Sequence, residues 1–400
     1  MKLSGGDLLL RALKDEGVKF IFGYPGGAAL HIYDSIFKQK ACEHILVRHE
    51  QGATHAADGY SRATGKPGVA LVTSGPGATN AITGLATAFM DSIPLVVISG
   101  QVQSHLIGTD SFQETDMIGI SRPIVKHSFI VQDTKDIPRI VQEAFHIATT
   151  GRPGPVVIDI PKDKTDPSKL YEYKRAKEIS LRSYQPRVLP HPGQIKKASK
   201  KILSAERPVI YAGGGVILGN ANKELINLNK LLKVPVTNTL MGLGAYPAKD
   251  KHFIGMLGMH GTYQANMAMH NADIIIAIGA RFDDRITNTP SMFAPNAKIV
   301  HIDVDPASIS KIINVDIPIV GQVKDSIVAL IKEIKRSKIK IDSEALDNWN
   351  MQISQWRKQH GLDHDLYLRK TKSSIIAPQV VVQELYHSTK GNAFVTSDVG

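Results

Sequence analysis

The sequence predicts an α/β protein with consecutive domains, each built on an open, mostly parallel sheet. Short runs rich in valine and isoleucine, such as 94–99 and 272–279, alternate with longer segments of helical period. This alternation is typical of βαβ units. Several of the runs end in glycine-rich turns, which mark the junctions between elements. A chain of 400 residues is also long enough for about two or three domains of ordinary size.

The first domain is expected over residues 1–165. Ser4 and Asp7 form a weak capping box, which predicts a helix from Ser4 to about Glu16. The sequence then predicts, in chain order, a strand at 19–23, a Pro-Gly-Gly turn, a helix near 28–38, a strand at 45–49, a helix at 50–64, a strand at 68–73, a glycine-rich turn with a small-residue helix at 74–89, and strands at 94–99 and 155–161.

A polar linker over 166–190 should lead to a second α/β domain over 191–335, because the linker lacks periodic apolar positions. The apolar runs of that domain lie at 207–215, 234–239, 272–279 and 298–305. A second linker is expected at 336–373. The final stretch, 374–400, predicts a helix at 378–390 and a strand at 393–400. Since no helix follows to cover this strand, we expect it to begin a third domain that is truncated after residue 400.

Composition excludes several classes of protein. The apolar fraction of 42% and the charged fraction of 21% are ordinary for a soluble globular protein. The longest apolar runs fall short of the roughly 20 residues that a membrane helix needs, so no membrane partner is expected. The first residues lack the apolar stretch of a secretory leader. Cys42 is the single cysteine, which excludes an internal disulfide, and the protein is expected to be cytoplasmic.

The net charge of +11 raises the question of nucleic-acid binding. The basic residues are dispersed, however, and the densest basic stretch, 331–340, has no interleaved aromatic side chains. We therefore expect no nucleic-acid partner. The fifteen histidines show no HExxH or similar ligand spacing, so a metal site built from this chain's own side chains is not expected.

Glu50 stands where a predicted strand passes into helix 50–64. Taken alone, it suits a helix-start residue that complements the helix dipole. The helix is rich in alanine and glycine on all sides, which indicates that something packs very close to it. The nearby turn at 74–81 has a backbone suited to the close approach of a ring or a phosphate. A functional acid is therefore the alternative interpretation.

Two features of the second domain are partial matches to a dinucleotide site. Gly213, Gly214 and Gly215 follow a predicted strand, and Asp303 and Asp305 end another. Neither feature is a complete GxGxxG motif, and an aspartate at a strand end is commonly a helix cap.

A resemblance to the thiamine-diphosphate-dependent decarboxylase and carboligase family is carried by FGYPGGA (22–28), VRHEQGATHAADGYSRATGKPGV (47–69), TSGPGATNAITGLATAFMDSIPLVVISGQV (73–102) and GRPGPVVIDIPKD (151–163). Within that family, the chain is similar to the catalytic subunits of the acetolactate synthase (acetohydroxyacid synthase) branch at 108–129, 240–247, 255–273, 279–285 and 301–311. The resemblance covers nearly all of 3–330 and resumes at about 376–400. Its matches occur in the same order along the chain.

The resemblance implies a transferase of aldehyde or ketone residues. Enzymes of this branch decarboxylate pyruvate on thiamine diphosphate and ligate the hydroxyethyl group to pyruvate or 2-oxobutyrate, in branched-chain amino acid biosynthesis. The implied cofactors are thiamine diphosphate, FAD and Mg²⁺, and the implied partners are a second large subunit and a small regulatory subunit. Two alternatives remain: another thiamine flavoenzyme, such as pyruvate oxidase or glyoxylate carboligase, or a non-catalytic truncated remnant that binds FAD or a partner.

The implied catalytic acid is Glu50, which in the family forms a hydrogen bond to N1′ of the coenzyme's pyrimidine and so promotes loss of the C2 proton. Gly26 and Gln113 correspond to residues that line the reacting centre, and Pro76 and Asn80 to residues near the pyrimidine. The positions that correspond to substrate contacts are Arg285, Phe112, Met259 and Lys162. An arginine suits a planar acceptor carboxylate. For Arg285 the alternative is surface pairing with Asp283 or Asp284, and for the other three it is ordinary packing or a solvated charge.

The positions that correspond to FAD contacts are Arg152, Gly213, Gly214, Gly215, Leu257, Gly258, Met259, His260, Gly279, Ala280, Arg281, Phe282, Asp283, Asp303, Val304 and Gln322. Gln322 departs from the family, which usually carries an acidic residue there. The flavin is expected to be structural, because the reaction has no net redox change. The family's GDG motif for Mg²⁺ and diphosphate is absent from these residues. We therefore expect the Mg²⁺ site in a missing third domain, and no catalysis by these 400 residues alone.

Overall fold

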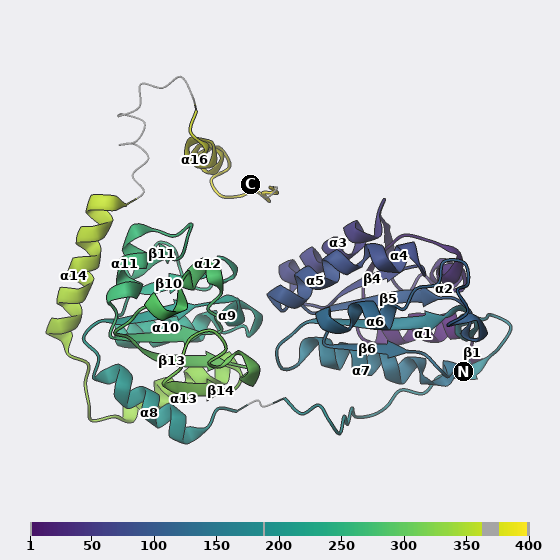
Figure 1. The fold of residues 1–400 in the computed structure, drawn as a ribbon, viewed down its shortest axis with the longest axis horizontal. Coiled ribbons are helices and arrows are strands. Elements are labelled where there is room, and N and C mark those ends of the chain that lie inside the picture. The colour runs from purple at the N-terminus through teal and green to yellow at the C-terminus, as the bar shows by residue number, and fades with distance from the viewer. Residues whose placement is uncertain (1, 187–188, 362–375, 398–400) are drawn as a thin grey trace.

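The computed structural model describes residues 2–186, 189–361 and 376–397. It shows two lobes that are each built on a six-stranded sheet (Figure 1). Neighbouring strands within each of these sheets are parallel. The predicted α/β architecture with parallel sheets is therefore confirmed.

The first sheet has the strand order β3-β2-β4-β5-β7-β6. Its strands are β2 (Phe20–Gly23), β3 (Glu43–Leu46), β4 (Gly68–Val72), β5 (Leu95–Gln101), β6 (His127–Ile130) and β7 (Pro155–Pro161). Side chains along β5 alternate between the two faces, as the pleat requires. Val96 and Ile98 join one core cluster and Leu95 and Val97 the other.

The helices of the first lobe are α1 (Gly5–Asp15), α2 (Leu30–Gln39), α3 (Glu50–Thr64), α4 (Pro76–Asn80), α5 (Ile82–Asp91), α6 (Met117–Ser121) and α7 (Ile137–Thr149). One core cluster joins the sheet to α1, α2 and α7, and the other joins it to α3 and α5, so helices cover both faces (Figure 1). Ser4 caps α1 through Oγ, which accepts a hydrogen bond from the Asp7 amide at 3.2 Å. The predicted start of this helix is confirmed.

The second sheet has the strand order β11-β10-β9-β12-β13-β14. Its strands are β9 (Pro208–Ala212), β10 (Val236–Asn238), β11 (Phe253–Met256), β12 (Ile274–Ile278), β13 (Lys298–Asp303) and β14 (Ile317–Val320). The helices of this lobe are α8 (Pro192–Leu203), α9 (Gly214–Leu218), α10 (Asn222–Leu232), α11 (Tyr263–Asn271), α12 (Asp284–Thr287), α13 (Val323–Arg336) and α14 (Ser343–His360). Strands β9 and β12 are buried throughout and form the centre of the core.

The connection between the lobes runs along the first lobe before it reaches α8 (Figure 1). It contains β8 (Tyr171–Glu172), which pairs antiparallel with β1 (Lys2–Leu3). The Tyr173 hydroxyl donates a hydrogen bond to Asp15 at 2.6 Å. Part of the segment predicted as a linker is therefore attached to the first lobe.

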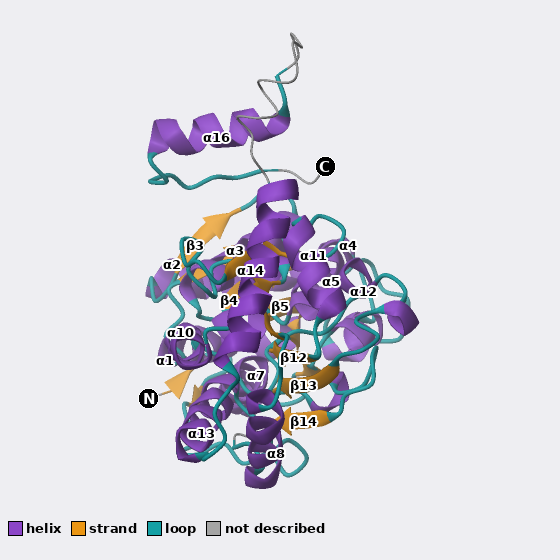
Figure 2. Ribbon diagram, turned by 90° about the vertical axis from the view of Figure 1, so that its left-hand side faces the viewer, coloured by secondary structure: helices purple, strands orange, loops and turns teal. Residues whose placement is uncertain are grey.

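The second predicted linker, 336–373, differs from the structure, because most of its described part, 336–361, is helix α14. Leu346, Trp349 and Ile353 are buried against the second lobe, and the Trp349 indole donates a hydrogen bond to the Pro208 carbonyl at 3.2 Å. The helix lies on the outer side of this lobe (Figures 1 and 2). Apart from Met351, the exposed side chains of α14 are polar, which explains why its helical period is weak in the sequence. The rest of this predicted linker, from 362 on, lies outside the described residues.

Two predicted strands also need correction. Strand 45–49 is instead Glu43–Leu46, because the chain leaves the sheet to place His49 as the N-cap of α3. Residues 393–397 form no strand, since the described part of the chain offers no neighbouring strand there, and 398–400 lie outside it. The helix predicted before them is confirmed as α16 (Pro378–Thr389). In the parts of the chain described, no helix has the length and apolar character to cross a membrane.

Candidate functional site

Glu50 is the first residue of α3, directly beyond the carboxyl end of β3. The Nδ1 atom of His49 accepts a hydrogen bond from the Gln51 amide at 3.1 Å and so caps the helix. Glu50 is only 8% exposed, although it is an acidic residue. The position at a helix N-terminus stabilises its negative charge. Glu50 is therefore a buried acid and not a solvated helix-start residue.

The carboxyl group of Glu50 has one fixed oxygen and one available oxygen. Oε2 accepts a hydrogen bond from the Asn80 side-chain amide at 2.9 Å. Among the residues that the structure describes, Oε1 makes no hydrogen bond, and a β-carbon at Gly77 would lie 3.2 Å from it. Asn80 and Gly77 both belong to α4, which begins at the exposed Pro76. One short helix thus orients the carboxyl group and leaves space beside it.

Tyr33 is a neighbour of this site that the sequence did not reveal. Its hydroxyl lies 3.2 Å from Nε2 of His44. Burial, and secondarily the negative charge of Glu50, raises the pKa of Tyr33 well above its ordinary value. Tyr33 therefore stays neutral and remains a hydrogen-bond donor at physiological pH.

Gly26 and Gln113 lie on loops at the same edge of the first sheet. A β-carbon at Gly26 would lie 2.4 Å from Cγ2 of Thr73, so the turn can approach the end of β4 only with a glycine at this position. The backbone of Gln113, with φ at 57°, rests against Gly75, where a β-carbon would lie 2.6 Å from the Gln113 carbonyl oxygen. The predicted residues Gly26, Glu50, Pro76, Asn80 and Gln113 thus all lie beyond the carboxyl ends of parallel strands.

Two of the predicted substrate positions lie near this edge. Phe112 is 87% exposed and makes no core contact. Lys162 follows β7 in a short 3₁₀ helix, η5 (Lys162–Thr165), and its carbonyl accepts a hydrogen bond from the Thr165 hydroxyl at 2.9 Å.

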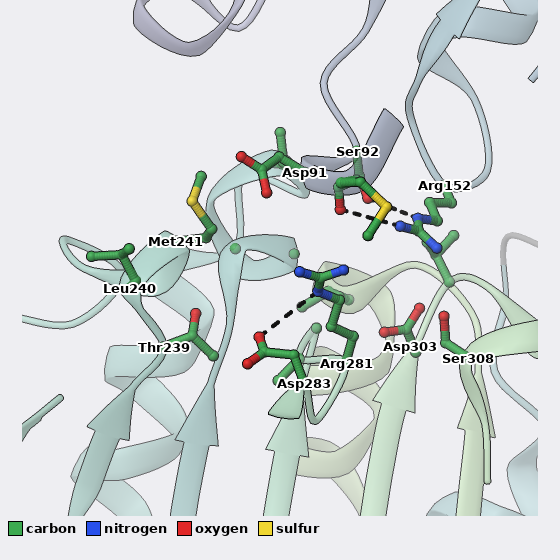
Figure 3. A pocket seen from close by; sticks show the side chains of 18 of the residues that line it. Asp91, Ser92, Arg152, Thr239, Leu240, Met241, Arg281, Asp283, Asp303 and Ser308 are labelled. Carbon is green, nitrogen blue, oxygen red and sulfur yellow. Dashed lines mark hydrogen bonds and ion pairs between the residues drawn. The ribbon is translucent and has the colours of Figure 1, made fainter. Parts of the chain in front are cut away.

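A separate cavity of about 680 Å³ lies between the two lobes (Figure 3). The predicted residues that line it are Arg152, Gly214, Gly215, Leu257, Met259, His260, Gly279, Ala280, Arg281, Asp283, Arg285, Asp303, Val304 and Gln322. Its lining also includes residues that the sequence did not indicate, namely Asp91 and Ser92 from the first lobe and Thr239, Met241 and Ser308 from the second. None of these five is among the FAD positions that the family resemblance implies, although Asp91, Ser92, Met241 and Ser308 lie within segments that carry the resemblance.

Three predicted residues do not line the cavity but support it. Gly213 lies behind the wall, where a β-carbon would be 2.1 Å from the Gly279 carbonyl oxygen. Phe282 is buried between Tyr211 and His301. A β-carbon at Gly258 would lie 2.6 Å from the carbonyl oxygen of Arg285.

Glycines allow the cavity to reach the centre of the second sheet. Gly215 donates a backbone hydrogen bond to the Gly279 carbonyl at 3.0 Å, and a β-carbon at Gly215 would lie 2.7 Å from Cα of Gly279. Gly279 has φ at 58°, in the left-handed region that favours glycine. These residues follow β9 and β12, the two strands at which the strand order reverses direction. Ligands of open α/β sheets bind at such a point.

The polar groups of the cavity come from both lobes. Arg152 donates a hydrogen bond to the Ser92 hydroxyl at 2.7 Å and lies 3.5 Å from Asp305, so it links the lobes. Arg281 projects into the cavity, 3.9 Å from Asp283 (Figure 3). These cations are suited to an anionic group such as a diphosphate.

Arg285 combines the two possibilities that the sequence left open. It lines the cavity, and its Nε lies 3.8 Å from Asp284. Its side chain is 69% exposed, so the ion pair is weak and the guanidinium is available to a ligand.

Two family models match the chain. The model described as "Thiamine pyrophosphate enzyme, N-terminal TPP binding domain" matches residues 3–120. The model described as "Thiamine pyrophosphate enzyme, central domain" matches residues 195–330. The first match includes Glu50 and α4, and the second includes most of the cavity wall.

Named relatives match the whole chain. It is 54% identical over 399 residues to a protein of Haemophilus influenzae named acetolactate synthase large subunit, and the match spans all of this chain and 69% of that relative. A Buchnera aphidicola protein of the same name is 56% identical over 398 residues, with 68% of its length covered. The acetolactate synthase isozyme 3 large subunit of Escherichia coli is 52% identical over 398 residues, also with 68% covered.

Proposed function

The chain belongs to the family of acetolactate synthase large subunits, and from this we propose that it is a catalytic subunit that decarboxylates pyruvate and joins the two-carbon product to pyruvate or 2-oxobutyrate. We further propose that it acts in the cytoplasm, with a second copy of itself and a small regulatory subunit. The relatives' common name does not favour the alternatives of a pyruvate oxidase, a glyoxylate carboligase or a non-catalytic remnant.

The arrangement of Glu50 carries this proposal. Bound thiamine diphosphate supplies an electron sink for the decarboxylation of a 2-oxo acid. The chain's part is to hold a proton-sharing carboxyl group against a ring nitrogen of that coenzyme. Glu50 fits this role because it is buried, its Oε2 is fixed by Asn80, and its Oε1 is available beside Gly77. The neutral hydroxyl of Tyr33 adds no competing charge.

The cavity between the lobes fits FAD. The strand order of the second sheet is that of Rossmann dinucleotide-binding folds, and the glycines at its reversal point permit close backbone approach. The volume of about 680 Å³ lies in the ordinary range for ligand sites, roughly 300–1,000 Å³. We assign Arg152 and Arg281 to the anionic centre of the cofactor and Asp303, at the end of β13, to a hydroxyl group. The flavin serves structure, because the proposed reaction has no net redox change.

Arg285 is proposed to bind the carboxylate of the acceptor 2-oxo acid. Gly258 and Met259 fix its backbone, since the Met259 amide donates a hydrogen bond to the Arg285 carbonyl at 2.9 Å. The guanidinium itself is largely exposed and so is accessible to a substrate. The residues described include no group of three or more side chains that could hold a metal ion. None of the described residues is therefore assigned to Mg²⁺.

The test is an assay of acetolactate formation by the purified protein, as its gene encodes it. Thiamine diphosphate, Mg²⁺ and FAD are each omitted in turn. Acetolactate should form only when thiamine diphosphate and Mg²⁺ are both present, and FAD should remain in its oxidised form during turnover. Absence of acetolactate with all three cofactors supplied would reject the proposed function. Reduction of the flavin in step with turnover would indicate an oxidase instead.

A further inference from the structure

The loop over 102–116 joins β5 to α6 and carries Gln113 to the edge of the sheet where Glu50 lies. Its conformation is an unusual one. Gly108, Asp110 and Gln113 all have positive φ, at 84°, 55° and 57°. Non-glycine residues rarely adopt this region, and they do so where the surrounding structure imposes it.

At one end of the loop, Gln101 uses its whole side-chain amide as an anchor. Its Nε2 donates hydrogen bonds to the Thr115 carbonyl at 2.8 Å and to Oδ2 of Asp159 at 3.0 Å. Its Oε1 accepts a hydrogen bond from the Val102 amide at 2.8 Å. Gln101 is 4% exposed and Asp159, in β7, is 1% exposed. Gln101 therefore ties both ends of the loop, Val102 and Thr115, to one buried carboxyl group.

A second carboxyl group holds the early part of the loop. Oδ1 of Asp163 accepts hydrogen bonds from the Ser104 amide at 2.7 Å and the Ser104 hydroxyl at 2.9 Å. Asp163 lies in η5, just beyond β7. The strand end that carries Asp159 is thus followed within one turn by a second anchor for the same loop.

The anchored loop reaches Glu50 through a short series of contacts. Within the loop, Glu114 accepts backbone hydrogen bonds from Gly108 and Ser111. The Gln113 backbone rests against Gly75, which directly precedes α4. Asn80 of α4 in turn holds Glu50. The position of Gln113 relative to Glu50 is therefore set by the Gln101 and Asp163 anchors on one side and by Gly75 on the other.

Burying the polar Asp159–Gln101 pair costs stability. Within the described residues, Oδ1 of Asp159 has no hydrogen-bond partner, although the group is almost fully buried. A well-packed apolar pair at such a place is commonly as stable or more stable. An apolar pair would, however, leave the Thr115 carbonyl without this donor and free the loop.

We propose that Gln101, Asp159, Ser104 and Asp163 are positioning residues that hold the 102–116 loop so that Gln113 faces the reacting centre beside Glu50. The proposal rests on the function proposed above. None of these four residues is proposed to touch substrate. Each contributes to catalysis by holding the loop in place.

A double-mutant cycle tests whether the anchor acts through Gln113. Gln101→Met keeps the side-chain volume but removes both donors, and it should lower kcat/KM for acetolactate formation about tenfold or more. Gln113→Ala alone should have a comparable effect. Because both changes disable the same group, the double variant should be little worse than either single one. Independent, multiplying effects of the two substitutions would overturn the proposal.

Rescue separates positioning from loss of packing. Asp159→Leu should reproduce the kinetic loss of Gln101→Met. Asp159→Asn keeps an oxygen that can accept the hydrogen bond from Gln101, so this variant should retain most of the wild-type kcat/KM. Equal kcat/KM values for the leucine and asparagine variants, both folded, would count against the anchor.

Hydrogen exchange of backbone amides supplies a readout without turnover. Ser104→Ala, at a half-buried position, should speed exchange over 104–116 and leave β5 and β7 unchanged. Asp166→Asn is the matched control, since this half-buried carboxylate accepts hydrogen bonds, among the described residues, from Ser168 alone and should alter nothing in the loop. Unchanged exchange over 104–116 in Ser104→Ala and Gln101→Met would reject the anchor. This arm remains informative even if the wild-type protein makes no acetolactate, in which case only the proposed function fails.

Discussion

The two proposed sites are built on opposite physical principles. At the edge of the first sheet, a buried carboxyl group is held by a specific side-chain hydrogen bond, from Asn80 to Glu50. Between the lobes, the centre of the cavity is shaped by glycines, and the charged side chains around it are partly exposed. A proton-transfer site needs one group in one orientation. A cofactor cradle needs backbone without side chains, together with cations at its rim.

This difference makes the two sites separable by mutation. A change that alters only the protonation of Glu50 should stop turnover and leave the cradle filled. A substitution that adds a side chain to one of the glycines of the cavity should prevent FAD from binding and leave the Glu50 carboxyl group in place.

Glu50→Gln should give the largest effect. The amide keeps the shape of the side chain and a hydrogen bond with Asn80 but cannot exchange a proton. Turnover should fall about 10²–10⁴-fold, the usual contribution of a general acid or base. FAD content, measured by absorbance after gel filtration, should match the wild-type value. Near-normal turnover of the variant would contradict the role assigned to Glu50.

Gly215→Val should produce the reciprocal result. Its β-carbon would meet the backbone of Gly279 at about 2.7 Å, and backbone cannot move aside as a flexible side chain can. We expect FAD affinity to fall at least about tenfold, with a loss of stability of roughly 1–3 kcal/mol from overpacking. The matched control is Gly59→Ala, since a β-carbon at Gly59 would meet no atom within 4 Å. Retention of FAD at wild-type affinity by Gly215→Val would show that the flavin does not use this wall.

Arg285→Ala should affect the second half of the reaction more than the first. Loss of a hydrogen bond to a charged group costs about 1.5–3 kcal/mol, so carboligation should fall by about tenfold or more. Release of carbon dioxide from pyruvate should fall less. Both rates are measured on the same samples, by acetolactate yield and by carbon dioxide evolution. Equal losses would favour a general role for Arg285 in the cavity over a contact with the acceptor.

The sequence predicts some features of these two sites but not the contacts that form only on folding. The junction at Glu50 could be seen as a strand that runs into a small-residue helix, and the three glycines 213–215 stand together in the chain. The contact of Gly215 with Gly279 could not be predicted from local pattern, because it forms only when β9 and β12 pair. Helix α14 was missed because its buried side chains, among them Trp349, are few in a polar segment.

The hydrogen bond between Gln101 and Asp159 could not be predicted from the sequence, for a reason different from that for α14. PVVIDIP predicts a buried strand, and the structure confirms one at β7. The pattern does not show whether Asp159 ends the strand or lies within it and faces Gln101 on the neighbouring strand β5. Strand register decides the matter, since Ser99 pairs with Asp159 and brings Gln101 within reach.

The smallest predicted effect concerns stability and not turnover. Burial, opposed by the hydrogen bond from Gln101 and assisted by the charge of Asp116, raises the pKa of Asp159 to about 7. The folded protein therefore binds this proton more tightly than the unfolded chain does, and stability should decrease as pH rises from about 4 to about 7. Between about pH 6 and pH 7.5 the loss should be roughly 1 kcal/mol.

Asp159→Asn should remove this part of the pH dependence, because its amide does not titrate. The measurement is urea unfolding of the two proteins at a series of pH values, with the difference between them taken at each pH so that other titrating groups cancel. The Asp159→Asn variant should gain on the wild type as pH increases. A constant difference across the range would mean that Asp159 is ionised in the folded protein as it is in the unfolded chain. The buried carboxyl of Asp159 would then resemble the charged side chains around the cavity more than it resembles a proton-sharing group.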